Sequence, residues 1–540
     1  MKKICIIISV LFTMNLRAQT VNLTKSNLPI IVINTNGITI PDEPKINANM
    51  KVFWKGDGVS NSTNDAAVFD GKIGVELRGS TSQDLSDKKP FSIEVRDASG
   101  NDIDTSLIGM PKESDWALVA PYSDKSLIRD ALIYGWARSF MAYAPRTKFC
   151  EVVVNGSYQG VYVLTEKIKR GKNRVNISKV DTTAVSGDAL TGGYILKIDK
   201  ETGAQPTGIS LGFSSKYTSG VNGIKRTYFY HYPKPEDIKT AHKTYIQTAI
   251  NEFEDVMRSA NFADLNNGYA KYIDVNTFVD FVILNEISRN VDGYRLSTFL
   301  YKDKNSVASK FKMGPVWDFN IALGNADYCK GFRVIDWAID FNKTCPDDGF
   351  QVPFWMEKMF ADPEFKKKMK SRWTQLRTKE LSDANLKVPI DSLTNLLAES
   401  QVRNFQTWKI LGKYVWPNPV ISNTYKEEID YLRIWLTDRV KWMDNTILTF
   451  PTAINEVVEQ ANVRPNPSVS GFNFDYALQN NSEVKILIYN QLGQNIYLSN
   501  VKQAAGQNQL FWNEDAPRGI YFYEILIDGN RKMAGKILKE

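Results

Sequence analysis

The spacing of apolar residues changes after Ile454, and this change most constrains the fold. Between about residues 236 and 448, apolar residues recur at helical spacing over several long segments. Beyond Pro465 and Pro467, short segments such as EVKILIYN and GIYFYEILID alternate apolar and polar residues. Six or seven such strands within about 80 residues predict a small β-sandwich. We therefore expect a linker over 451–465 and a separate sandwich domain over 466–540.

The amino terminus has the pattern of an export signal. Lys2 and Lys3 precede the apolar stretch 4–16, and Arg17-Ala18-Gln19 provides a small-residue cleavage site. We expect a signal peptide over 1–19 and an exported protein. No later run has the roughly 18 apolar residues of a transmembrane helix.

Charge argues against nucleic acid as a partner. The formal charge of +7 falls to +4 (7 − 3) when the three basic residues of the signal are removed. The remaining charges are mixed along the chain, without the basic face that nucleic-acid binding needs.

Cysteine and histidine counts restrict the chemistry. In an exported protein, Cys329 and Cys345 are expected to pair, and Cys150, in the strand-like FCEVVVN, is expected to be a buried free thiol; sequence alone does not prove this pairing. Only His231 and His242 are present, neither beside a GxSxG elbow, so we interpret both as structural. A His-rich zinc site is excluded.

The central part of the chain predicts an α+β fold. Short strands are expected over residues 20 to about 70, and further strands in GKIGVELRGSTSQ and KKPFSIEVRD. A helix capped by Ser123 or Asp124 follows, and then a hairpin at Asn155-Gly156, a pair that favours type I′ turns. This order of strands and helix matches the amino-terminal lobe of a protein kinase. Further strands over 190–235 precede helices over 236–258, 274–290 and 353–448. We predict a two-lobe core over 71–450, preceded by a β-rich extension over 20–70.

Two acidic residues follow predicted elements in the order that phosphoryl-transfer enzymes use. Asp292 comes after a helix, and Asp318 follows the strand-like segment ending in Trp317. Kinases use a loop acid to orient the acceptor hydroxyl and a second acid to hold Mg²⁺. The structural alternative is that Asp292 caps a turn and Asp318 pairs with an arginine.

Several motifs together resemble the spore-coat-protein-H-like (CotH) kinase family over roughly 70–450. They are Arg78-Gly79-Ser80-Thr81-Ser82, Lys88-Lys89-Pro90-Phe91, Asp115-Trp116, Asp124…Leu127…Arg129, Asn155-Gly156…Gly160-Val161-Tyr162…Glu166, Asp292…Tyr301 and Trp317-Asp318-Phe319. The final residues resemble the type A sorting domain of the type IX secretion system, through PNPS, IYNQLGQ and GIYFYEI.

These resemblances imply an atypical secreted kinase with a role for each matched residue. Its cofactors would be ATP with Mg²⁺ or Mn²⁺, its substrate Ser or Thr of a protein, and its sorting partner the secretion machinery. The implied roles are a loop acid (Asp292), a metal ligand (Asp318), contacts to phosphate (Arg78, and Lys88 or Lys89) and a position beside the adenine linker (Glu166). The alternatives are solvated lysines, a turn braced by Arg78, and pairing of Glu166 with Lys167 or Arg170.

Two positions of the metal site depart from the expected pattern. Ser297 stands where kinases carry an asparagine for the second metal, and Asn320 replaces the last acid of the family's Trp-Asp-Phe-Asp. Both changes weaken cation binding. They favour a second hypothesis, a non-catalytic surface or adhesion module with a pseudokinase fold. A third hypothesis is a glycoside hydrolase using Glu286 and Asp318, with Trp317 as a sugar platform.

Overall fold

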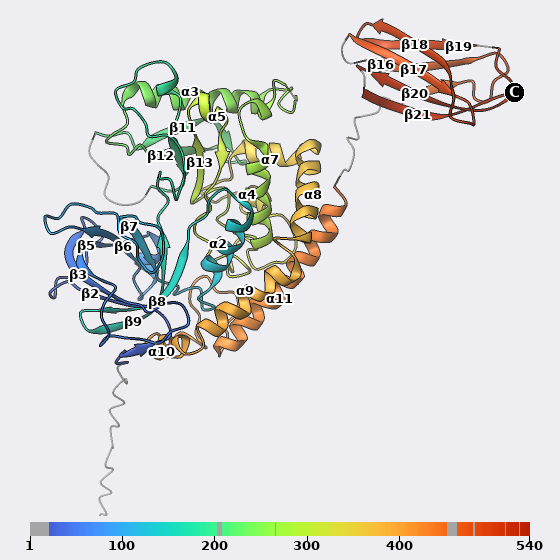
Figure 1. Cartoon of the computed structure of the whole chain (residues 1–540). Coiled ribbons are helices and arrows are strands. Elements are labelled where there is room, and N and C mark those ends of the chain that lie inside the picture. Colours follow the sequence, from blue (N-terminus) through green and yellow to red (C-terminus); the bar gives the residue numbers. More distant parts are fainter. Residues whose placement is uncertain are drawn as a thin grey trace, which may run out of the picture. The chain divides into compact units, whose positions relative to one another are not determined.

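The chain divides into two compact units, Met1–Phe450 and Pro451–Glu540 (Figure 1). The computed structural model describes residues 21–201, 208–264, 266–450, 462–478, 481–513, 515–528 and 530–540. The predicted signal 1–19 lies outside the described residues, as do residues 451–461 of the predicted linker. The mixture of helices and sheets fits the predicted α+β class.

Seven strands of the first unit close into a barrel in the order β2-β3-β5-β6-β7-β9-β8. They are β2 (Ile30–Asn34), β3 (Ile46–Phe53), β5 (Phe69–Leu77), β6 (Phe91–Arg96), β7 (Asp115–Val119), β8 (Thr147–Val154) and β9 (Ser157–Glu166). The parallel pair β2–β8 closes the barrel, with Ile30 opposite Glu151. Strands that the sequence assigned to an amino-terminal extension therefore complete this barrel, and the short β1 (Lys25–Ser26) pairs with β4 (Asn61–Ser62).

Local signals account for the hairpin and helix of this region. Asn155 and Gly156 have φ of 49° and 79°, the left-handed conformation that a type I′ turn requires, so the predicted β8–β9 hairpin is confirmed. α2 (Arg129–Phe140) begins just after Asp124, whose carboxylate accepts hydrogen bonds from the backbone N–H of Ser126 and Arg129.

A five-stranded antiparallel sheet follows in the order β11-β12-β10-β13-β14. Its strands are β10 (Tyr194–Ile198), β11 (Gly212–Ser219), β12 (Ile224–Tyr232), β13 (Thr298–Lys302) and β14 (Lys312–Met313). α3 (Thr240–Arg258) and the almost wholly buried α4 (Val275–Ser288) confirm two predicted helices. α4 ends at Ser288 and is capped by Arg289, whose φ of 43° turns the chain into the loop that carries Asp292.

Helices make up the rest of the first unit, as predicted (Figure 1). The longer ones are α7 (Phe354–Ala361), α8 (Pro363–Thr378), α9 (Asp383–Leu396), α10 (Ser400–Thr407) and α11 (Tyr425–Leu448). The short ones are α1 (Thr81–Leu85), α5 (Asn305–Ala308) and α6 (Phe341–Thr344), with 3₁₀ turns η1 (Asp188–Leu190), η2 (Tyr269–Lys271) and η3 (Ala338–Asp340). Side chains of Asp362, Ser382 and Thr424 cap α8, α9 and α11.

The expected disulfide and free thiol are both confirmed. Cys329 and Cys345 are bonded, with their Cα atoms 5.7 Å apart, and close the loop that follows the Asp318 segment. Cys150 is free and buried in β8.

The second unit is a sandwich of two sheets around its own core (Figure 1). One sheet contains β15 (Asn462–Arg464), β16 (Phe472–Leu478) and β19 (Gly506–Trp512). The other contains β17 (Ser482–Tyr489), β18 (Asn495–Gln503), β20 (Gly519–Ile527) and β21 (Asn530–Lys539). Alternate residues of β16 and β17 are buried, which is the pattern that predicted these strands.

Candidate functional site

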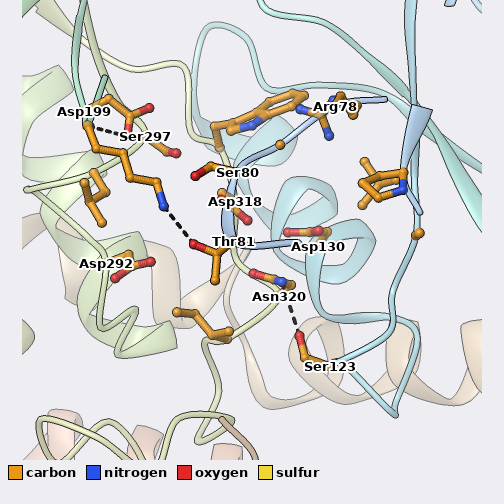
Figure 2. A pocket seen from close by; sticks show the side chains of 18 of the residues that line it. Arg78, Ser80, Thr81, Ser123, Asp130, Asp199, Asp292, Ser297, Asp318 and Asn320 are labelled. Carbon is orange, nitrogen blue, oxygen red and sulfur yellow. Dashed lines mark hydrogen bonds between the residues drawn. The ribbon is translucent and has the colours of Figure 1, made fainter. Parts of the chain in front are cut away.

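A cavity of about 350 Å³ lies where the barrel, the five-stranded sheet and α2 meet. Residues after β5 and β9 line it from the barrel, and residues after β10 and before β13 line it from the sheet. The first turns of α2 and the segment after β14 complete the wall. Figure 2 shows its polar side chains converging from these separate elements.

Both acids predicted from the sequence line this cavity. Asp292 accepts hydrogen bonds at Oδ1 from Arg295 Nη2 (2.6 Å) and Tyr328 OH (3.1 Å). Arg295 is itself buried, so it holds the Asp292 carboxylate in one orientation. Burial nevertheless raises the pKa of Asp292 above its ordinary value, and the Arg295 charge opposes this rise.

Asp318 has a backbone conformation that the surrounding structure imposes. Its φ is 65°, in the left-handed region that side chains other than glycine rarely adopt. Its N–H donates to Tyr134 OH (2.9 Å), and Asn290 Nδ2 donates to its carbonyl (3.3 Å). The Asp318 side chain is exposed to the cavity but enclosed by the cavity walls. This enclosure, followed by repulsion from Asp292, raises the pKa of Asp318.

A third carboxylate, Asp130, was not predicted from the sequence. It lies in the first turn of α2, lines the cavity, and accepts a hydrogen bond from the backbone N–H of Phe319 (2.7 Å). Burial, and then repulsion from Asp318, raises its pKa. Nothing in the sequence marks Asp130 as a site residue, because an acid in the first turn of a helix usually only complements the helix dipole.

The oxygen atoms at the cavity suit a hard divalent cation. Ser297 and Asn320 line the cavity beside the acids, and Asn320 Nδ2 donates to Ser123 Oγ (3.5 Å). In the described part of the chain, no group of three or more His, Cys, Asp or Glu side chains is arranged to hold a metal ion. Mg²⁺, however, commonly takes only one or two protein carboxylates, together with water and phosphate oxygens. The donor set around Asp318 and Asp130 fits that kind of site.

Basic side chains occupy the same cavity. The Arg78 guanidinium lies 5.4 Å from the centre of the Trp317 ring, and Lys167, Lys197 and Lys200 also line the wall. Burial lowers the pKa of Lys167 to about 8. Lys200 Nζ donates to Thr81 Oγ1 (2.7 Å), which joins the start of α1 to the segment just after β10 (Figure 2).

Three residues predicted for the site lie outside the cavity. Lys88 is buried and donates to the carbonyl of Val161 and to Asn404 Oδ1 (2.9 Å), so it is not solvated either. Lys89 Nζ donates to the carbonyl of Gln83 (2.5 Å). Glu166 pairs with Arg146 (3.0 Å) and not with Lys167 or Arg170. The structure therefore does not bring Lys88, Lys89 or Glu166 to the acids.

The carboxylate pair of the hydrolase hypothesis is also not brought together. Glu286 is fully buried, forms an ion pair with Arg439 (3.1 Å), and accepts hydrogen bonds from the N–H groups of Ala338 and Ile339. A carboxylate held in this way braces the fold. His231 lines the cavity, but its Nε2 interacts with the carbonyl of Ile168 (2.8 Å), and burial lowers its pKa to about 4.

Comparison with known proteins gives two family matches. The family described as CotH kinase protein matches residues 75–443, and the family described as Secretion system C-terminal sorting domain matches residues 462–540. No curated protein matches the chain. Among solved structures, an alkylpurine DNA glycosylase (AlkC) of Pseudomonas fluorescens, bound to DNA with an abasic-site analogue, is 13% identical. The match covers 35% of this chain and 72% of that chain, with a TM-score of 0.12, which is too low to indicate a shared fold. No helix in the described ranges is long and apolar enough to cross a membrane.

Proposed function

The chain belongs to the CotH kinase family with a carboxyl-terminal secretion sorting domain, and on this basis we propose that it is an atypical protein kinase. It would transfer the γ-phosphate of ATP to Ser or Thr of a protein substrate. The sorting domain indicates secretion and surface localisation, and interaction with the secretion machinery. The barrel and the helical part would act as two lobes around the nucleotide.

One observation carries this proposal: four acids (Asp130, Asp199, Asp292 and Asp318) and several cations from separate elements share a single cavity. In the sequence β13, α5 and β14 lie between Asp292 and Asp318, yet both acids line the cavity together with Arg78. Enclosed carboxylates that raise one another's pKa favour a cation, and neighbouring guanidinium and ammonium groups favour phosphate oxygens. Metal and phosphate are the two charged parts of a metal–nucleotide complex.

Each residue can then be given a role in positioning. Asp292, held by Arg295 and Tyr328, accepts a hydrogen bond from the acceptor hydroxyl and orients it toward the phosphate. Asp318, with Asp130 and Asn320, would hold Mg²⁺ or Mn²⁺.

When bound, that ion supplies charge neutralisation at the phosphates. Arg78 donates to phosphate oxygens, as the resemblance implied, and Lys167 takes the place that the resemblance gave to Lys88 or Lys89.

A second candidate is a non-catalytic surface module with the same fold. Ser297 and Asn320 favour this candidate. Ser297 has a hydroxyl where kinases have an asparagine amide, and Asn320 has a neutral amide where the family has a carboxylate. Each replacement binds a cation less strongly than the group that it replaces. The two candidates differ in nucleotide binding, which the first requires and the second does not.

Calorimetry with ATP and Mg²⁺ or Mn²⁺, on the mature full-length protein, tests the proposal. We expect metal-dependent binding that Asp318→Ala weakens by about a hundredfold, a loss of roughly 3 kcal/mol. Asp104→Ala, at an exposed position between β6 and β7, is the matched control and should bind as the wild type does. A folded wild-type protein that binds no nucleotide with either metal would reject the kinase and leave the surface module.

A further inference from the structure

One part of the cavity wall is aromatic and open to solvent. Trp416, in the segment between α10 and α11, lines the cavity and is 42% exposed. On the same segment Tyr414, Val420 and Ile421 are 53%, 38% and 49% exposed. Exposed apolar side chains gathered on one short segment beside a cavity commonly mark a binding surface.

Trp416 contacts Asp292 indirectly, through the side chain of Tyr328. It stacks on Tyr328, with ring centroids 5.7 Å apart and planes at 12°. The Tyr328 hydroxyl donates to Asp292 Oδ1 (3.1 Å). The exposed indole therefore lies on the Asp292 side of the cavity, where the acceptor hydroxyl would enter.

The segment that carries Trp416 is held in place by specific hydrogen bonds. The backbone N–H of Asp327 donates to the carbonyl of Pro417 (2.8 Å), and Tyr414 OH donates to Asp327 Oδ2 (2.7 Å). Asn418 Nδ2 donates to the carbonyl of Ser123 (2.7 Å). These hydrogen bonds hold the aromatic surface in a fixed position. A ligand that binds this surface therefore need not order the segment, and little conformational entropy of the protein is lost.

We propose that Trp416 is the docking platform for the acceptor polypeptide, and that it selects Ser or Thr residues with an aromatic or large aliphatic neighbour. This inference rests on the proposed kinase function. The path from the indole to Asp292 comprises the 5.7 Å ring stack and the 3.1 Å hydrogen bond, which extended chain covers in about two to three residues at roughly 3.3 Å each. The selected side chain therefore stands two or three positions from the acceptor hydroxyl, and packs on the indole.

The test compares two short labelled peptides that carry one serine among glycine and alanine residues. One peptide has phenylalanine two positions before the serine, and the other has alanine there. Binding is measured by fluorescence anisotropy on the full-length mature protein, and MgATP or MnATP affinity is measured separately by calorimetry. The variants are Trp416→Ala, Trp416→Phe and, as a matched apolar control, the exposed Ile434→Ala of α11.

We expect the wild type to prefer the phenylalanine peptide by about tenfold, the scale of one buried aromatic contact. Trp416→Ala should lose this preference with unchanged nucleotide affinity, whereas Trp416→Phe retains part of it and Ile434→Ala all of it. Equal binding of the two peptides by wild type, or an unchanged preference in a folded Trp416→Ala, overturns the inference.

Nucleotide binding separates this inference from the kinase proposal. Trp416→Ala could lower nucleotide affinity and leave the peptide preference unchanged. That result would assign the indole to nucleotide binding and would overturn the docking role. If wild type binds no nucleotide but keeps a Trp416-dependent peptide preference, the kinase proposal fails while the polypeptide platform stands.

Discussion

Four carboxylates, those of Asp130, Asp199, Asp292 and Asp318, share one enclosed cavity and repel one another, and the protein neutralises them unequally. Asp292 has a direct ion pair with Arg295, at 2.6 Å. Asp130 and Asp318 have Arg78 as a nearby opposing charge, and their pKa values remain raised. A divalent cation between Asp130 and Asp318 would remove this repulsion, which is the physical reason to test Asp130 as a ligand.

We predict that Asp130→Asn weakens Mn²⁺ binding by about tenfold or more, since one of two carboxylate ligands is lost. The same change should stabilise the metal-free protein, because it removes one repelled charge and keeps an acceptor for the N–H of Phe319. Calorimetric titration with Mn²⁺ and thermal unfolding in chelator measure the two effects. The exposed control Asp104→Asn should change neither, and an unchanged Mn²⁺ affinity in Asp130→Asn would show that Asp130 is not a ligand.

Lys88 should make stability depend on pH. Burial lowers its pKa to about 7 in the folded protein, whereas an unfolded lysine keeps its proton to about pH 10. Between these values the unfolded state binds more protons, so the free energy of unfolding rises with pH. We predict that Lys88→Met removes up to about 1.4 kcal/mol per pH unit of this rise.

Denaturant unfolding at pH 7, 8 and 9 measures the slope in wild type and variant. The exposed Lys112→Met serves as control and should keep the wild-type slope. A slope that is the same in Lys88→Met and wild type would mean that Lys88 titrates normally in the folded protein.

Site residues were predictable from the sequence only where a local motif carries them. Asp292, Ser297 and Asp318 stand at fixed distances from recognisable elements, and all three line the cavity. Lys167 and Asp130 reach it only through the tertiary arrangement of β9 and α2, which no local pattern records. Lys88 matched a motif, but its side chain contacts Asn404 of α10, a residue 316 positions away.

At the scale of elements, the disulfide closes a loop that supports the site from behind. The loop runs from Cys329 to Cys345 and contains η3, whose N–H groups bind Glu286 at the end of α4. Tyr328, which contacts Asp292, directly precedes Cys329. The disulfide therefore stabilises two segments that support Asp292: Tyr328, which contacts its carboxylate, and η3, which holds the end of α4.

We predict that the double substitution Cys329→Ser and Cys345→Ser lowers the free energy of unfolding by about 3 kcal/mol, the loop-closure value for a loop of this length. Denaturant unfolding with and without reductant measures it, and reductant should destabilise wild type by a similar amount. Cys150→Ala keeps the disulfide and should respond to reductant as wild type does. If reductant does not change the free energy of unfolding of the wild-type protein, the expectation is wrong.

Elements formed by near neighbours were predicted well, and their long-range assembly was not. The β8–β9 hairpin and α4 follow from turn residues and apolar spacing, both of which are local. Closure of the barrel depends on the parallel pairing of β2 with β8, whose strands lie more than 100 residues apart. Sequence spacing carries no information about such a pairing, so β2 and β3 were assigned to a separate extension.

At the scale of the whole molecule, two units with separate cores should unfold separately. The first unit has its cores in the barrel and around α4, and the second has a core around Trp512. We predict two calorimetric transitions for the mature protein, of which removal of residues 451–540 eliminates one. That truncation should leave nucleotide affinity unchanged and abolish surface localisation, which fractionation and immunodetection would measure. A single cooperative transition that shifts on truncation would contradict this independence.

The closed barrel has a consequence for a protein that must persist outside the cell. An open sheet ends in strands whose unpaired N–H and C=O groups can recruit another chain and start aggregation. Pairing of β2 with β8 gives every strand of the barrel a neighbour on both sides. Energy-dependent refolding does not operate outside the cytoplasm, so closure permanently protects this part of the secreted molecule from edge-to-edge polymerisation, whereas the five-stranded sheet and the two sandwich sheets keep edge strands.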